Sequence, residues 1–194
     1  MSSLFQHSVP FEAVAGALFE PHWYALYTSA RHEKQVADVL ERKQFEVFLP
    51  LYESLRRWKD RRVLLELPLF PGYLFVRIAL RDRLEILKVP GTVRFVAFSG
   101  KPVPLADREL EVLRLGLSKG GCAIPHPYLR VGRRVRVKNG PFAGLEGILL
   151  RKKDRYRVVL SLELIMRSVS VEVDATDVDP LQKINSFSPH HDGA

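Results

Sequence analysis

Five cationic side chains and one tryptophan lie within seven residues in the first half of the chain: Arg56, Arg57, Trp58, Lys59, Arg61 and Arg62. Clustered Arg and Lys side chains bind nucleic-acid phosphates, with an affinity that falls as salt rises and does not depend on base sequence. A tryptophan among them can stack on an exposed base. The alternative is a solvated hairpin with Trp58 folded back onto its own domain, and the residues alone leave both interpretations open.

A second stretch, residues 68–76, carries three aromatic side chains and no charge. Its two prolines lack an amide donor, so its first half cannot form a central strand or the interior of a helix. Strand-forming residues follow, with the side chains of Tyr73 and Phe75 predicted on one face and Phe70 on the preceding turn. Such a cluster is either plain core, which these residues alone favour, or an apolar docking surface.

The composition is that of a globular protein with one medium domain or two small ones. The 194 residues are 46% hydrophobic and 27% charged, which excludes the disordered and fibrous classes. The single cysteine, Cys122, excludes an internal disulfide framework and fits a reducing compartment. No apolar run approaches the roughly 20 residues that span a bilayer. The apolar run 13–19 has no preceding basic residue, unlike a secretory signal. We therefore expect a cytoplasmic protein that does not contact a membrane.

The net charge of +8 is distributed unevenly along the chain. Residues 129–157 hold 10 Lys and Arg against 2 Asp and Glu, whereas residues 158–194 are acidic. Such a basic segment attracts a polyanion, or part of it pairs with Asp174, Asp177 and Asp179 within one small domain. The basic side chains expected on the rim of this domain are Arg133, Arg134, Arg136, Lys138, Arg151, Lys152 and Lys153.

Hydrophobic periodicity predicts the elements that position these residues. The first part of the chain favours helices on a sheet that is mainly antiparallel. Beyond a Gly- and Pro-rich segment every stretch is strand-like, with a turn at Asn139–Gly140, which favours a small closed barrel. The expected strands are 23–27, 45–49, 73–79, 92–98, 134–138, 147–151, 155–164 and 169–173. The expected hairpin is 51–67, and the expected helices are 30–43 with Ser29 as N-cap, a short one from Asp82, and 105–118.

Two groups of motifs resemble known domains. The segments Trp23–Tyr27, Pro68–Val76 and Val89–Val96, with Glu33 in the helix after the first of them, resemble the NusG N-terminal (NGN) domain. The segment Val131–Ile148 resembles a KOW module. A KOW module alone also occurs in ribosomal proteins. The two joined by a short linker are specific to NusG-like transcription elongation and antitermination factors, and the resemblance covers most of the chain.

This resemblance implies an α+β fold, with an N-terminal α/β sandwich of a mainly antiparallel sheet and flanking helices, followed by a small SH3-like β-barrel. The implied limits are a flexible N-terminal arm at 1–21, an NGN-like RNA polymerase-binding domain at 22–118, a linker at 119–128, a KOW β-barrel at 129–182 and a disordered tail at 183–194. The family acts by binding, so no enzymatic activity, cofactor or metal is expected. The sequence has no nucleophile elbow, phosphate loop or zinc-ligand spacing.

In this family the first domain binds the clamp helices of the large RNA polymerase subunit through an apolar depression. Holding the clamp closed over nucleic acid suppresses pausing or termination. By match, Tyr27, Phe70, Pro71, Tyr73 and Phe75 line that depression, and at least Phe70 and Tyr73 are expected to be exposed. Core packing is the alternative for each of them, above all for Phe75.

The resemblance also implies contacts with nucleic acid and with a further partner. The basic hairpin is expected to reach upstream DNA or the non-template strand. In RfaH-like relatives the start of the first helix reads the displaced strand, and that region here holds Arg31, His32 and Gln35, although a solvated helix face explains them equally well. In the KOW module, glycines are expected to serve the architecture, and the basic rim to contact a partner: a ribosomal protein, Rho or RNA. The glycines are Gly140, Gly144 and Gly147.

Residues 162–173 resemble the ending of specialised paralogues of the UpxY, RfaH and LoaP type and lack the Gly-Arg pair usual in housekeeping NusG. This implies a monomeric factor that acts on a limited set of operons. The alternatives are the general NusG factor and an RNA- or ribosome-binding protein that uses the KOW module alone. RfaH switches its second domain between helices and a barrel, but β-branched residues at period two, such as Val169 and Val171, predict a constitutive barrel here.

Overall fold

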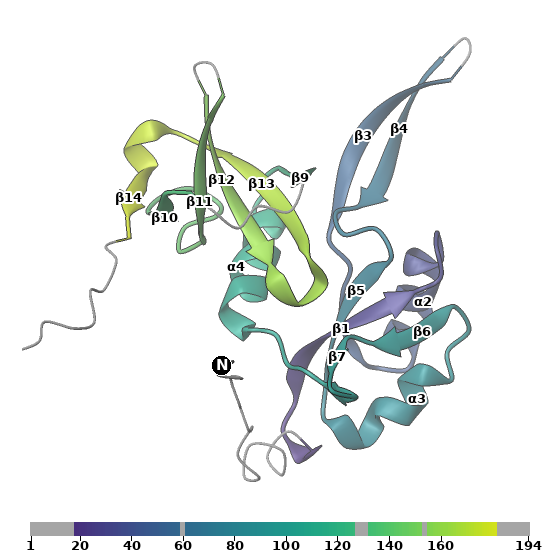
Figure 1. The fold of residues 1–194 in the computed structure, drawn as a ribbon. Helices are drawn as coiled ribbons and strands as arrows, with labels where there is room; N and C mark the ends of the chain where they lie inside the picture. Colours follow the sequence, from purple (N-terminus) through teal and green to yellow (C-terminus); the bar gives the residue numbers. More distant parts are fainter. Residues whose placement is uncertain (1–17, 59–60, 127–131, 153–154, 182–194) are drawn as a thin grey trace, which may run out of the picture.

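The computed structural model describes residues 18–58, 61–126, 132–152 and 155–181. The expected tail and most of the expected N-terminal arm lie outside these ranges, as do Lys59 and Lys153. Figure 1 shows an α+β protein, with an N-terminal sheet and helices followed by a C-terminal β domain, as the resemblance implied.

The N-terminal sheet has four antiparallel strands in the order β2-β5-β1-β6. Side chains alternate between the faces of a strand, and the central strands β1 and β5 are apolar on both faces. In β1, Trp23 and Ala25 point to one face, and Tyr24 and Leu26 to the other. Both faces must therefore be covered by other parts of the chain. The strands span His22–Thr28 (β1), Glu46–Phe48 (β2), Tyr73–Ile78 (β5) and Thr92–Phe95 (β6).

Helices α2 (Glu33–Arg42) and α3 (Arg83–Leu87) cover the face that holds Tyr24. Burial raises the pKa of the Tyr24 phenol. The prediction that the first helix starts at Ala30 with Ser29 as its cap is wrong, because Arg31 has a φ of 64°, outside the helical region.

The opposite face of the sheet packs against α4 (Asp107–Ser118) and the C-terminal domain. Trp23, Phe48 and Phe75 belong to one continuous cluster of buried side chains with Leu110 and Leu113 of α4. The same cluster continues into the strands of the C-terminal domain. The two domains therefore share one apolar core.

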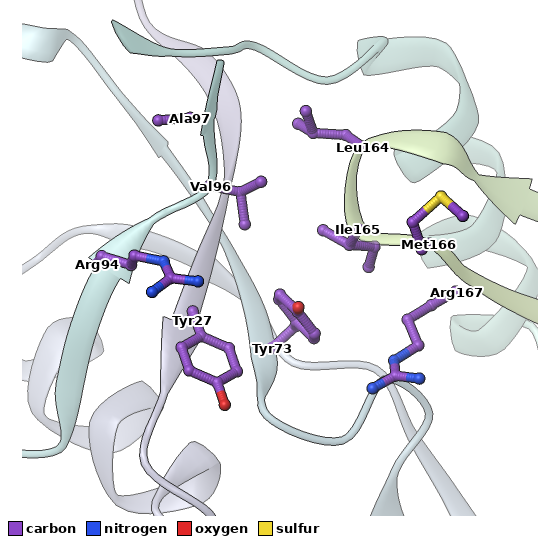
Figure 2. Close-up of a pocket in the computed structure, with 9 residues that line it drawn as sticks. All are labelled: Tyr27, Tyr73, Arg94, Val96, Ala97, Leu164, Ile165, Met166 and Arg167. Atoms are coloured by element: carbon purple, nitrogen blue, oxygen red, sulfur yellow. The ribbon is translucent and has the colours of Figure 1, made fainter. Parts of the chain in front are cut away.

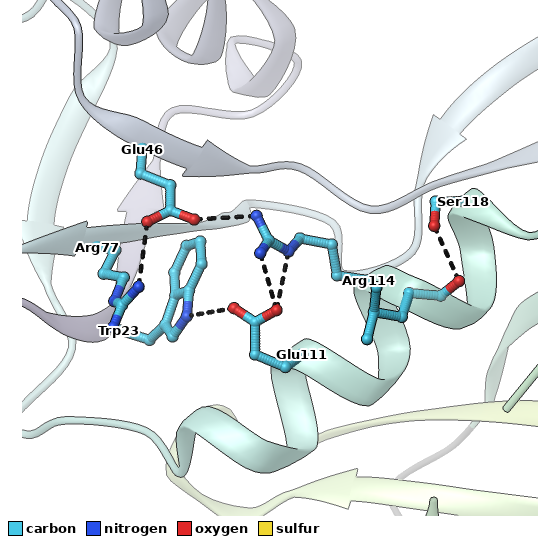
Figure 3. A network of polar contacts seen from close by, with 7 residues as sticks. Trp23, Glu46, Arg77, Glu111, Arg114 and Ser118 are labelled. Atoms are coloured by element: carbon cyan, nitrogen blue, oxygen red, sulfur yellow. Dashed lines mark hydrogen bonds and ion pairs between the residues drawn. The ribbon is translucent and has the colours of Figure 1, made fainter. Parts of the chain in front are cut away.

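A polar network ties α4 to three strands of the sheet, as Figure 3 shows. Trp23 Nε1–H donates to Glu111 Oε1 at 3.2 Å, and the Arg114 guanidinium donates to Glu111 Oε2 at 2.8 Å and to Glu46 Oε1 at 2.9 Å. The second oxygen of Glu46 lies 3.5 Å from the Arg77 guanidinium. The network fixes the position of α4 across the sheet.

The expected hairpin at 51–67 is formed by β3 (Leu51–Trp58) and β4 (Arg61–Pro68), which project from the body of the protein (Figure 1). At its base, Tyr52 is partly buried and packs on the shared core. The expected strand 92–98 is interrupted. β6 ends at Phe95, and β7 (Ala97–Phe98) pairs instead with β8 (Lys101–Pro102).

The C-terminal domain is a six-stranded antiparallel sheet in the order β14-β10-β11-β12-β13-β9. Val169 and Val171 face the shared core as the period of two predicts, together with Val158 and Leu160 of β12. The other face is buried too, at Val159, Ser168 and Ser170. The expected strand 155–164 ends earlier, at Leu162, because η2 (Glu163–Ile165) follows it. The strands span Ala123–His126 (β9), Arg134–Val137 (β10), Glu146–Lys152 (β11), Arg155–Leu162 (β12), Arg167–Val173 (β13) and Val178–Pro180 (β14).

The sequence predicts a linker at 119–128, but part of this segment belongs to the C-terminal sheet. Ala123–His126 forms β9 and pairs with β13. Ala123 is buried, which anchors the segment in the core. β9 is an outer strand of the sheet, where Pro125 is tolerated because one side of the strand needs no hydrogen bonds.

Two glycines of the α4 region make room for an aromatic ring of the C-terminal domain. A Cβ atom at Gly116 or Gly121 would collide with the ring of Phe142, which is buried. At the other end of α4, the Arg108 guanidinium lies 3.6 Å from a Glu146 carboxylate oxygen of the C-terminal domain. Helix α4 therefore connects the two domains by packing as well as by sequence.

Replacement of Gly116 by alanine is expected to lower the free energy of unfolding by about 1–3 kcal/mol, because the new methyl group overpacks against the Phe142 ring. Alanine is otherwise the better helix former by about 1 kcal/mol. Chemical denaturation measures the change, with Leu115→Ala, at an exposed position of the same helix, as control. An unchanged or higher stability of Gly116→Ala would contradict the packing described here.

Candidate functional site

A tight turn joins the basic hairpin to β5. Tyr73 N–H donates to the Phe70 carbonyl at 2.9 Å, and Gly72 between them has a φ of 82°. This combination of proline at the second position and glycine at the third is typical of a type II turn. Gly72 also lies against a tyrosine: a Cβ atom there would be 3.2 Å from the ring of Tyr27.

A buried carboxylate holds this turn on helix α2. Glu33, in the first turn of the helix, is 6% exposed, and its Oε1 accepts a hydrogen bond from Gly72 N–H at 2.8 Å. The Gly72 carbonyl in turn accepts from Thr28 N–H at 2.9 Å. The turn is thus fixed between β1 and α2, which sets the positions of the aromatic side chains around it.

Tyr27 and Tyr73 form a partly buried pair at the surface beside this turn. Their ring centroids are 5.2 Å apart, and the Arg94 guanidinium lies 5.3 Å from the centroid of the Tyr27 ring. A cation near the face of a tyrosine is attracted by the negative potential of the ring. Pro71 is exposed next to them. We call Tyr27, Pro71 and Tyr73 the tyrosine patch.

Phe70 and Phe75 do not belong to the surface. Both are 0% exposed, so the expectation that Phe70 is exposed is wrong and the core alternative holds for Phe75. Their rings meet edge to face at 5.4 Å, and Phe75 lies 6.1 Å from Phe48 in the shared core. The turn directs the Phe70 side chain to the face of the sheet that holds Trp23 and Phe75. There it belongs to the apolar core shared with α4 and the C-terminal domain.

A cavity of about 410 Å³ lies between the tyrosine patch and the C-terminal domain (Figure 2). Its N-terminal wall includes the two tyrosines and Arg94, and its opposite wall is the segment Leu164–Arg167, which links β12 to β13. Within that segment Met166 is 57% exposed and has a φ of 51°. The C-terminal domain thus shares the space in front of the tyrosine patch.

Sequence reasoning did not identify Arg94 or Leu164–Arg167 as part of this site. Arg94 stands in a motif that the sequence does single out, Val89–Val96, but no pattern indicates that its side chain lies over Tyr27. The segment Leu164–Arg167 lies about 90 residues beyond Tyr73 in the sequence. Only the packing of the two domains brings it there.

The expected nucleic-acid residues of helix α2 lie beside the hairpin. Arg31, His32 and Gln35 are all exposed near the start of the helix. Between them in sequence, Lys34 Nζ lies 3.2 Å from Glu66 Oε2 at the base of β4. The start of α2 and the base of the hairpin are therefore adjacent on the surface.

The described cations of the hairpin divide between its two faces. Residues opposite each other in the strand pairing share a face, which places Arg57 with Arg62, and Arg56 with Val63 on the other face. Arg56, Arg57, Arg61 and Arg62 are all exposed. Trp58 pairs with Arg61 at the end of the described strands. The side chain of Trp58 lies outside the described part of the structure.

The basic rim expected on the C-terminal domain is partly neutralised by its own acids. Arg136 donates to Glu146 Oε1 with its Nε at 2.9 Å, and Lys138 Nζ lies 3.2 Å from Asp179 Oδ1. Arg133 and Arg134 are exposed. Arg151 and Lys152 end strand β11, and Lys153 lies outside the described residues. The pairing that the sequence left as an alternative, with Asp174, Asp177 and Asp179, therefore accounts for Lys138, whereas Arg136 is paired with Glu146 instead.

The three glycines expected to serve the architecture occupy tight positions of this domain. Gly140 and Gly144 have φ values of 83° and 89°, which suit glycine. A Cβ atom at Gly147 would collide with the backbone of Val159 on the neighbouring strand.

Within the described part of the chain, no three His, Cys, Asp or Glu residues are grouped so that they could hold a metal ion. The helices described there include none that is long and apolar enough to cross a membrane. The described residues also place the tyrosine patch next to the projecting basic hairpin.

Comparison with known proteins identifies similar sequences over most of the chain. A family model described as "Transcription termination factor nusG" matches residues 21–114. The transcription termination/antitermination protein NusG of Thermus thermophilus is 31% identical over 178 residues, which cover 80% of this chain and 96% of the relative. NusG of Staphylococcus aureus is 27% identical over 176 residues, covering 82% and 95%.

A solved structure described as "Domain interaction in Thermotoga maritima NusG" is similar with a TM-score of 0.52 and 24% identity, covering 86% of this chain and all of that chain. This likeness supports the fold. The Thermus relative also supports membership of the family, because the similarity covers 80% of this chain and 96% of the relative. The chain belongs to the NusG family of transcription termination/antitermination factors.

Proposed function

We propose that this chain binds RNA polymerase through the tyrosine patch and keeps the elongating enzyme from pausing or terminating. The observation that carries the proposal is the partly exposed pair of Tyr27, in β1, and Tyr73, at the end of a turn that Glu33 holds by a hydrogen bond to Gly72. Rigid aromatic side chains supply apolar contact area at low entropic cost, and such side chains dominate interface energetics. The expected docking element is the clamp-helix pair of the large polymerase subunit.

The proposed mechanism needs no bond chemistry. A factor that binds the closed clamp better than the open one shifts the polymerase population toward the closed, elongating state. A change of only about 1.4 kcal/mol in the barrier for escape from a pause gives tenfold faster escape. Binding energy from a few aromatic side chains is sufficient for this effect.

Docking requires the C-terminal domain to make room. The segment Leu164–Arg167 lines the same cavity as Tyr27 and Tyr73, so a polymerase helix that reaches both rings has to displace it. Arg133 and Arg134, which are already exposed, are proposed to contact a second partner, for which a ribosomal protein, Rho and RNA are the candidates. In this proposal residues 22–118 act as the polymerase-binding unit and 129–182 as the partner-binding unit.

The hairpin and the start of α2 are proposed to contact nucleic acid next to the docked domain. The exposed cations Arg56, Arg57 and Arg62 supply phosphate contacts, and the adjacent Arg31 and Gln35 lie within the same surface. Upstream DNA and the non-template strand are the expected ligands. Their binding is salt-dependent because it rests on phosphate neutralisation.

The proposed role is that of a specialised paralogue that serves a limited set of operons. The sequence of residues 162–173, which includes the cavity segment, is the feature that favours it over general NusG. Chromatin immunoprecipitation of the factor together with polymerase tests this choice. Occupancy restricted to a few long operons supports the specialised role, whereas occupancy of most transcribed genes supports the general one.

Replacement of Tyr73 by alanine is expected to weaken binding to purified RNA polymerase about 30-fold, or about 2 kcal/mol, because it removes a central aromatic anchor. Biolayer interferometry with the full chain measures the dissociation constant. Tyr73 is preferred to Phe70, because a substitution at the fully buried Phe70 would disturb the core.

The matched control is Phe98→Ala, since Phe98 is 74% exposed and does not line the cavity. This variant is expected to bind polymerase as the wild type does. Wild-type affinity of Tyr73→Ala, with the fold intact by circular dichroism, would refute the proposed docking surface.

Replacement of Arg56 and Arg62 by glutamine is expected to weaken binding to a forked DNA and to lower the slope of log affinity against log salt by about 2, since each phosphate contact contributes about 0.9. Fluorescence anisotropy at several KCl concentrations gives the slope. Arg83→Gln, an exposed cation of α3, is the control. An unchanged slope in the double variant would exclude phosphate contacts by these two side chains.

A further inference from the structure

One face of the hairpin has a charge pattern that the proposed function does not explain. The strand register places three pairs on this face, in order from base to tip: Glu53 with Glu66, Leu55 with Leu64, and Arg57 with Arg62. All six side chains are exposed, the two leucines by 60% and 57%. The face is therefore acidic at its base, apolar in its middle and basic at its tip.

This pattern is unfavourable for an isolated ribbon. Like charges directly opposite each other on neighbouring strands are destabilising. Lys34, 3.2 Å from Glu66, offsets part of this cost at the base, and the Arg57–Arg62 pair retains it. Two adjacent exposed leucines leave apolar area in water, and a two-stranded ribbon has little stability of its own. Each of these costs falls when another surface with the reverse order of charges covers the face.

A second copy of the same face, rotated by a twofold axis, presents its charges in the reverse order: basic over the acidic base and acidic over the basic tip. Leu55 is two residues from Glu53 and two from Arg57, and Leu64 is equally spaced between Arg62 and Glu66. A twofold axis that crosses both strands at the leucine pair lays the tip of one hairpin over the base of the other. A contact of this isologous kind closes as a dimer.

We propose that two copies of this chain associate face to face through the hairpins. The four leucines pack at the centre, Arg57 pairs with Glu53 of the second copy, and Arg62 pairs with Glu66 of the second copy. The axis generates each ion pair twice. In this proposal the free protein forms a reversible dimer, in place of the monomer that the resemblance implies.

The surroundings of the face are compatible with this contact. The Lys34–Glu66 ion pair shows that the face lies on the side of α2, whereas Tyr52, on the other face, packs on the shared core. Lys34 contacts Glu66 Oε2, so Oε1 is available for an arginine. The C-terminal domain therefore does not cover this face.

The dimer is expected to be weak and sensitive to salt. One face of a single ribbon is smaller than the roughly 800 Å² that each partner buries in a standard interface, so we expect dissociation constants of roughly micromolar order. Exposed ion pairs are screened by salt. The inference does not rest on the proposed function, because it concerns the free protein. Nucleic acid bound to Arg57 and Arg62 would compete with the second copy.

Analytical ultracentrifugation of the full chain over a range of concentrations tests the proposal. At low salt we expect a monomer–dimer equilibrium, and Leu55→Ser is expected to raise its dissociation constant at least about tenfold. The control is Leu84→Ser, because Leu84 is also 60% exposed but lies on α3. A wild type that stays monomeric at low salt and high concentration would overturn the proposal. So would a dimer that Leu55→Ser leaves unchanged.

A charge exchange gives a second, independent test. The variant Arg57→Glu with Arg62→Glu has an all-acidic face, and Glu53→Arg with Glu66→Arg has an all-basic one, so each is expected to be monomeric alone. Their equimolar mixture is expected to form a heterodimer. With both variants folded by circular dichroism, failure of the mixture to associate contradicts the assigned geometry.

Discussion

The architecture depends on a sheet whose two central strands are apolar on both faces. Tyr24 and Leu26 on one side, and Trp23 and Ala25 on the other, are all buried. Helices α2 and α3 cover the first side, but they leave the second to α4 and the C-terminal domain. Because hydrophobic burial is the main driving force of folding, the closing of this second face determines how the two domains meet. It also determines which aromatic side chains remain accessible.

The tyrosine patch is what this core leaves at the surface. Phe70 and Phe75 are enclosed, whereas the turn that follows Phe70 brings Tyr73 beside Tyr27 at the edge of the cavity. The buried carboxylate of Glu33 satisfies the amide of Gly72, and a buried amide without a partner would cost about 1–3 kcal/mol. The position of the turn beside the tyrosine patch therefore depends on this hydrogen bond as much as on apolar packing.

Which basic side chains are left without an acidic partner depends on ion pairing within each domain as well as on composition. Residues 129–157 hold 10 Lys and Arg against 2 Asp and Glu, but Arg136 and Lys138 are engaged with Glu146 and Asp179. Residues 56–62 of the hairpin hold five Lys and Arg against one Asp. The hairpin projects from the body of the protein (Figure 1). Exposed charges act over about 8–10 Å at physiological ionic strength. The hairpin arginines Arg56, Arg57 and Arg62 are exposed, whereas Arg136 and Lys138 of the C-terminal domain are ion-paired.

The sequence by itself determined the fold class, most of the strands, the hairpin and the family, because alternation and turn residues are local and the paired motifs are specific. It also placed Tyr73 and Phe75 on one face of β5, which the strand register bears out. Only the tertiary structure decided that Phe70 is buried, that Ala123–His126 joins the C-terminal sheet, and that Leu164–Arg167 stands opposite Tyr27. The physical reason is that exposure and charge pairing depend on contacts between segments far apart in sequence, and no local pattern encodes which segment closes a shared core.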